Sequence, residues 1–98
     1  MAATVLVVDD EQLVRWSVRE RLAAEGYVVI EAATAAEAID KSADSVDLVL
    51  LDFRLPDGDG LSVLRRIKER SPETPVIMMT AFSTGQNAVE AMKLGAYH

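Results

Sequence analysis

Four short segments of strand-forming residues alternate with segments of helical spacing, and this alternation constrains the fold more than any other feature. Thr4–Val8 is a continuous apolar run, which is typical of a strand buried on both faces. Strands that alternate with helices through short connections form a parallel sheet covered by helices on both sides. The sequence therefore predicts an α/β, doubly wound parallel sheet. The other predicted strands cover residues 27–32, 47–51 and 75–80.

The segments between these strands carry helix signals. Apolar residues at helical spacing run from Val14 to Leu22, and Gly26 follows in a C-cap position. Thr34 and Glu37 have the spacing of a capping box, which predicts a second helix running towards residue 42. Two further helices are expected, one with Leu61, Leu64 and Ile67 on one face and ended by Ser71 and Pro72, the other capped by Ser83 or Thr84 and ended by Gly95.

Composition narrows the class of protein. The 98 residues suit a single domain with one core. No apolar run is long enough to span a bilayer, and no secretion signal precedes the first strand. With no cysteine, no disulfide framework is available, so we expect a cytoplasmic protein. A net charge of −6 argues against direct contact of this domain with nucleic acid, because binding depends on neutralising phosphates.

Polar residues stand where three predicted strands end. Asp9 and Asp10 follow the first strand, Asp52 follows the third, and Thr80 ends the fourth. If the strands are ordered 2-1-3-4, these ends are neighbours along one edge of the sheet, where such folds bind ligands. Adjacent carboxylates repel one another, and a hard divalent cation would offset that repulsion. Mg²⁺ prefers oxygen ligands, so the pattern predicts a magnesium site.

The chain resembles the receiver domain of bacterial two-component response regulators. The resemblance rests on VVDDE at the first strand, LVLLDFRLPDGDG around the third and PVIMMTAF at the fourth, and it extends over all 98 residues. It implies a flavodoxin-like fold. The stretches RWSVRERL and TAFSTGQNAVEAMKLGAYH resemble the nitrogen-regulator-type subgroup, whose members activate polymerase carrying an alternative sigma factor.

The resemblance also implies a role for each polar residue. Asp52 would be the phosphoacceptor, taking a phosphoryl group from a sensor histidine kinase. Asp10, Asp52 and the main-chain carbonyl of Arg54 would bind Mg²⁺, with Asp9 acting mostly through water. Thr80 would donate a hydrogen bond to the phosphoryl group. Such a domain is a signalling module rather than an enzyme, and it relays its state to a C-terminal output domain that regulates transcription.

Two other functions remain open on the residues alone. A degenerate receiver would mediate protein contacts without phosphorylation. A haloacid-dehalogenase-type phosphatase also phosphorylates an Asp at a strand end, but it has a second Asp two residues later, where this chain has Arg54. Residues 57–60 (DGDG) resemble a calcium loop only faintly, because the spacing and the final Glu are missing.

The resemblance further implies that a complete receiver continues beyond His98 into a fifth strand, a lysine at its tip and a fifth helix. We therefore expect an incomplete domain whose fourth strand has an unpaired edge, a feature that promotes dimerisation or other self-association. No membrane contact is expected. Trp16 and Met78 are expected to pack in the interior.

Overall fold

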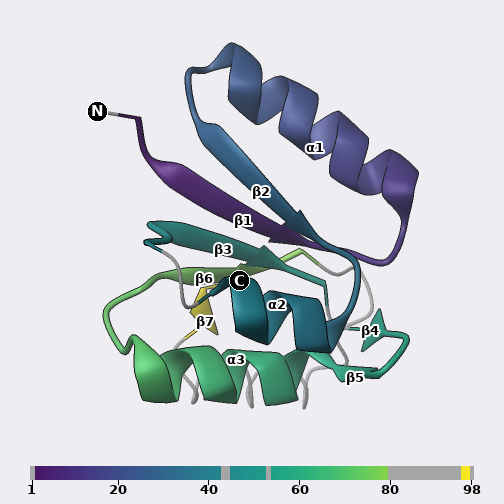
Figure 1. Ribbon diagram of the computed structural model, residues 1–98, viewed down its shortest axis with the longest axis vertical. Coiled ribbons are helices and arrows are strands. Elements are labelled where there is room, and N and C mark those ends of the chain that lie inside the picture. The colour runs from purple at the N-terminus through teal and green to yellow at the C-terminus, as the bar shows by residue number, and fades with distance from the viewer. Residues whose placement is uncertain (1, 43–44, 53, 80–95, 98) are drawn as a thin grey trace.

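A five-stranded parallel sheet forms the centre of the molecule, with the strand order β2-β1-β3-β6-β7 (Figure 1). The computed structural model describes residues 2–42, 45–52, 54–79 and 96–97. The predicted doubly wound, flavodoxin-like architecture is confirmed, and the predicted order 2-1-3-4 corresponds to β2-β1-β3-β6. The strands are β1 (Thr4–Val8), β2 (Val28–Ala32), β3 (Leu48–Leu51), β6 (Val76–Met78) and β7 (Ala96–Tyr97).

The fifth position of the sheet differs from the expectation. Strand β7 contributes two residues there, and its Ala96 and Tyr97 pair with Val76 and Ile77 of β6. The β6 edge that was expected to be unpaired is therefore paired at these two positions. Self-association through that edge stays a prediction, now confined to the part of β6 beyond Ile77.

Helices lie on both faces of the sheet. Helix α1 (Gln12–Ala24) covers one face, while α2 (Ala35–Lys41) and α3 (Gly60–Arg70) lie side by side on the other (Figure 1). Between β3 and α3 the chain also forms a small antiparallel hairpin, β4 (Arg54–Leu55) with β5 (Gly58–Asp59), which was not predicted. The helix expected after residue 82 lies outside the described residues.

The helix caps predicted at Gly26 and at Thr34 are confirmed. Gly26 has a positive φ of 91°, and the N–H groups of Gly26 and Tyr27 donate to the carbonyls of Ala23 and Leu22, which is the Schellman pattern. At the start of α2, the Thr34 hydroxyl accepts from the N–H of Glu37 at 3.1 Å. These local hydrogen bonds fix where each helix meets the sheet, and so where each strand ends.

The two faces of the sheet are buried to different extents. On the side of α2 and α3, alternate strand residues are buried against both helices. On the side of α1, Leu48, Leu50 and Ile77 are only half-buried, and no residue of α1 itself is buried. The main core therefore lies between the sheet and the α2–α3 pair, and consists of Leu6, Val8, Ala32, Ala35, Ala38, Val49, Leu51, Leu55, Val63, Leu64, Ile67, Val76 and Met78.

Helix α1 exposes two large apolar side chains, one of which was expected in the interior. Trp16 is 56% exposed and Leu13 is 72% exposed, so the prediction that Trp16 packs in the interior was wrong. The helical period places Trp16 on the outer face of α1, because the half-buried residues Val14, Val18 and Leu22 already occupy the inner face. Met78 is buried as predicted. Among the described residues, none of the helices has the length and apolar character needed to cross a membrane.

Candidate functional site

The sheet register brings three aspartates together at the carboxyl ends of β1 and β3. Val8 and Leu51, the last residues of these strands, lie directly opposite each other. The N–H of Asp52 donates to the carbonyl of Val8 at 2.9 Å, and the N–H of Asp9 donates to the carbonyl of Ala32 at 3.1 Å. The chain therefore leaves β1 and β3 at the same level, and the residues that follow become neighbours.

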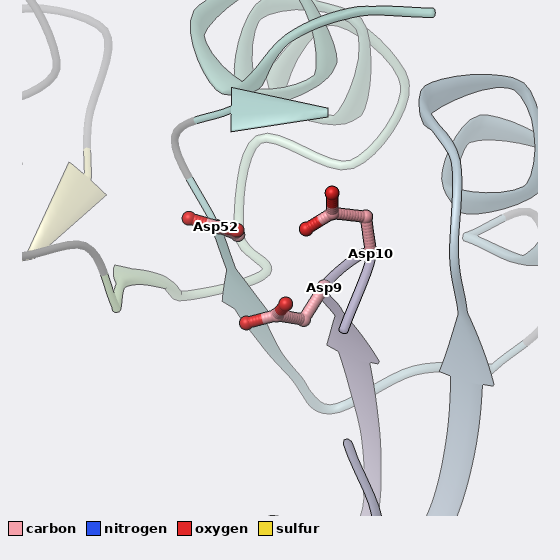
Figure 2. Close-up of side chains that lie close together, drawn as sticks. All are labelled: Asp9, Asp10 and Asp52. Carbon is pink, nitrogen blue, oxygen red and sulfur yellow. The ribbon is translucent and has the colours of Figure 1, made fainter. Parts of the chain in front are cut away.

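The carboxylates of Asp9, Asp10 and Asp52 lie close enough to share one cation. Each offers an oxygen, and these oxygens all lie within 4.8 Å of one another (Figure 2). Asp9 is buried, Asp52 is half-buried and Asp10 is exposed, so the cluster opens to solvent on the Asp10 side. Three like charges at this separation repel strongly, and an all-oxygen set of this kind suits a hard divalent cation. The convergence predicted from the sequence is thus present for these three residues.

Asp9 is held in place by a hydrogen bond from the backbone. It is 7% exposed, and one of its carboxylate oxygens, Oδ1, accepts a hydrogen bond from the N–H of Glu11 at 2.9 Å. Glu11 occupies the N-cap position of α1, yet its own side chain makes no capping hydrogen bond. One oxygen of Asp9 is therefore engaged by the backbone, which agrees with a supporting role for Asp9 beside Asp10 and Asp52.

The remaining predicted site residues are placed only in part. Arg54 begins the β4–β5 hairpin, two residues after Asp52, and its side chain is exposed. Binding of the cation by its main-chain carbonyl stays a prediction. Thr80 lies outside the described residues.

The hairpin after Asp52 is attached to α2 by a residue that sequence reasoning missed. The Asp57 carboxylate accepts hydrogen bonds from the N–H groups of Ala35 at 2.7 Å and Ala36 at 3.0 Å. These backbone hydrogen bonds hold the pKa of Asp57 below its ordinary value. Asp59, at the end of the same hairpin, caps α3 by accepting from the N–H of Ser62 at 2.8 Å. The segment that follows Asp52 is thereby fixed to both helices on that side of the sheet.

Arg15 was also missed. Its Nη1 donates to the main-chain carbonyl of Asp9 at 2.6 Å, and its Nε donates to Glu31 at 3.3 Å. The only signal in the sequence would have been its place in the first turns of α1, six residues after Asp9.

The sequence model of the response regulator receiver domain family matches residues 5–98, which is almost the whole chain. The chain belongs to the response regulator receiver domain family. This confirms the resemblance noted from the sequence, and the phosphatase alternative is set aside.

Individual proteins of this family are similar to the chain in sequence and in structure. Over 94 residues, or 95% of its length, the receiver is 40% identical to the DNA-binding transcriptional regulator NtrC of Escherichia coli, which fits the nitrogen-regulator-type resemblance. It spans only 20% of the length of NtrC. The crystal structure of a CheY-like receiver domain protein from Methanospirillum hungatei superposes with a TM-score of 0.95 at 33% identity, covering 98% of this chain and 78% of that one.

One similar structure was determined in a modified state. It is a response regulator from Burkholderia pseudomallei with a phosphorylated aspartic acid, a calcium ion and citrate. It is 26% identical to the receiver, with a TM-score of 0.90, over 96% of this chain and 56% of that one.

Proposed function

We propose that the receiver accepts a phosphoryl group on Asp52 and thereby transmits a signal. The observation that carries this proposal is the convergence of Asp9, Asp10 and Asp52 at the ends of β1 and β3, with oxygens within 4.8 Å of one another. Asp52 is half-buried and lies beside the exposed Asp10, on the open side of the cluster. A carboxylate in this position is a competent nucleophile for phosphoryl transfer.

The donor is a phosphohistidine of a sensor histidine kinase. A carboxylate oxygen of Asp52 attacks the phosphorus atom, the P–O bond to Asp52 forms, and the P–N bond to the histidine breaks. The electron pair of that bond returns to the imidazole nitrogen, which takes up a proton, and Asp52 becomes an acyl phosphate. Little covalent help is needed for this transfer, because its rate depends on alignment and on neutralisation of charge.

Asp10, Asp52 and the carbonyl of Arg54 hold Mg²⁺ in this proposal, with Asp9 supporting the site through water. When bound, Mg²⁺ neutralises negative charge shared by the carboxylates and the phosphoryl group. The residues present fit such an ion, since each of the three carboxylates offers an oxygen ligand of the type Mg²⁺ prefers. Thr80 donates a hydrogen bond to the phosphoryl group. We assign the receiver no turnover of an external substrate, only gain and loss of its own phosphoryl group.

An output domain that follows the receiver would read the phosphorylation state, and regulation of transcription is its proposed task. NtrC carries four-fifths of its length outside the matched region and is a DNA-binding transcriptional regulator. The receiver itself makes no direct contact with nucleic acid in this proposal, because its net charge is −6.

The competing function is that of a degenerate receiver, which would contact other proteins without being phosphorylated. Retention of both the nucleophile and the two acids beside it favours phosphorylation, since a contact module has no need for three mutually repelling carboxylates.

A small phosphodonor separates the two functions. The full-length protein is incubated with acetyl phosphate and Mg²⁺, and its intact mass is measured. We expect the mass of one phosphoryl group to be added to the wild type and none to Asp52→Asn. Asp40→Asn, which changes an exposed carboxylate on α2, is the matched control and should be labelled like the wild type.

Two results would count against the proposal. Full labelling of Asp52→Asn would mean that another residue is the acceptor. A wild type that stays unlabelled with acetyl phosphate and with phosphorylated kinase would favour the degenerate receiver.

A further inference from the structure

Arg15 connects the acid cluster to the neighbouring strand. Its side chain is 15% exposed, and its guanidinium donates to the main-chain carbonyl of Asp9 at 2.6 Å and to Oε1 of Glu31 at 3.3 Å. Glu31 is on β2, the strand that pairs with β1 on the side away from β3. The guanidinium therefore joins the first turn of α1, the end of β1 and the penultimate residue of β2.

The carbonyl that Arg15 holds is the one that orients Asp10. This carbonyl belongs to the peptide unit between Asp9 and Asp10. Because that unit is planar, a hydrogen bond that fixes the carbonyl also fixes the orientation of the backbone leading into Asp10. The N–H of Asp9 is held by Ala32, and the Asp9 carboxylate is held by the N–H of Glu11. Asp10 itself is exposed. The position of its backbone relative to Asp52 therefore depends on the hydrogen bond from Arg15.

Glu31 is in turn held in place. Its second oxygen accepts from Nη1 of Arg19 at 3.0 Å, and its main-chain carbonyl accepts from Nζ of Lys41 at 2.5 Å. A planar guanidinium donates along fixed directions, so an anchored carboxylate on one side orients the N–H that reaches Asp9 on the other.

We propose that Arg15, oriented by Glu31, is a positioning residue that sets the Asp9–Asp10 peptide for binding of a divalent cation by the acid cluster. This inference rests on the proposed function, since it concerns the same Mg²⁺ site. Arg15 touches neither the cation nor the phosphoryl group in this scheme. It acts through the backbone of the residues that do.

The sign of the effect separates positioning from simple electrostatics. Arg15 is a cation close to the acid cluster, so its charge alone opposes Mg²⁺ binding, and neutralising it should tighten binding. Loss of positioning has the opposite effect. Removing a partner that orients a metal ligand weakens metal binding by about tenfold.

The experiment measures Mg²⁺ affinity of the full-length protein by isothermal titration calorimetry. We expect Arg15→Gln to weaken Mg²⁺ binding about tenfold. The matched control is Arg21→Gln, which removes the same charge from a side chain of α1 that is 82% exposed and pairs with Glu25, and it should stay within about twofold of the wild type. Arg15→Lys keeps the charge and loses the forked geometry, so it should also weaken binding.

Several outcomes would overturn the inference. Unchanged or tighter binding in Arg15→Gln would show that the hydrogen bond to Asp9 does not position the site, while equal losses in Arg15→Gln and Arg21→Gln would show that the loss is not specific to that hydrogen bond. If Arg15→Gln is unfolded by circular dichroism, Glu31→Gln decides instead, and wild-type affinity in that variant contradicts the role of the pair. A wild type that binds no Mg²⁺ overturns the proposed function as well, whereas failure in Arg15→Gln alone leaves that function standing.

Discussion

At the scale of single residues, the site combines side chains that local sequence reveals with others that it hides. Asp9, Asp10 and Asp52 follow buried strands directly, so their convergence could be predicted once the strand order was assumed. Arg15 and Asp57 could not be found in this way. Arg15 acts on a main-chain carbonyl, and Asp57 accepts from N–H groups 21 and 22 residues away, and neither leaves a local pattern in the sequence.

Asp57 gives a prediction with a definite pH dependence. Hydrogen bonds from Ala35 and Ala36 lower its pKa in the folded state, so its contribution to stability is fully present above the ordinary value of 3.8 and is lost as the pH falls through the lowered value. Urea midpoints of wild type and Asp57→Asn should therefore differ at pH 6 and converge as the pH falls from 3.8 to below the lowered pKa. A gap between the two that is constant with pH would contradict this assignment.

At the scale of elements, helix ends with a local capping residue could be predicted from the sequence. The ends of α1 and α2 were foreseen because Gly26 and the pair Thr34–Glu37 act on their immediate neighbours. The β4–β5 hairpin was missed, since a segment with Pro and two Gly between residues 54 and 60 has no periodic pattern and is defined by only two paired residues per strand. Its attachment through Asp57 to α2 depends on tertiary structure.

The two glycines Gly26 and Gly58 test the account of the α1 cap. A Cβ at Gly26 would meet nothing within 4 Å, so the substitution causes no steric clash. Gly26→Ala should therefore lower the free energy of unfolding by about 1–2 kcal/mol, because alanine adopts a positive φ less readily than glycine. At Gly58, φ is not positive and a Cβ would make an ordinary 3.6 Å contact with Ala35. Gly58→Ala should therefore be neutral or stabilise by up to about 1 kcal/mol. Denaturant unfolding of both variants checks the pair, and equal effects would refute the account.

At the scale of the whole molecule, the sheet is well covered by α2 and α3 and less well by α1. Leu48, Leu50 and Ile77 remain half-buried on the α1 side, and Leu13 and Trp16 project outward. The doubly wound topology was predictable from the alternation of strands and helices. The helical pattern shows which residues of α1 share a face, and it does not show how closely that face approaches the sheet.

Binding of Mg²⁺ to the acid cluster should stabilise the whole receiver by mass action. At a Mg²⁺ concentration ten times the dissociation constant, the gain is roughly 1.4 kcal/mol, which raises the thermal midpoint of a domain of this size by roughly 6–11 °C. Asp10→Ala should remove most of this rise, because it deletes the exposed ligand of the cluster. A midpoint that does not move in the wild type, or that moves equally in Asp10→Ala, would argue against the site.

Chemical mapping can locate the phosphoryl group that we assign to Asp52. After reaction with a phosphodonor and Mg²⁺, the protein is treated with borohydride, which reduces an acyl phosphate to an alcohol and so converts the phosphorylated aspartate to homoserine. Peptide mass spectrometry then locates the homoserine. We expect homoserine at position 52, and only after exposure to the donor. Homoserine at position 9 or 10, or none at position 52 in protein whose intact mass shows the phosphoryl group, would contradict that assignment.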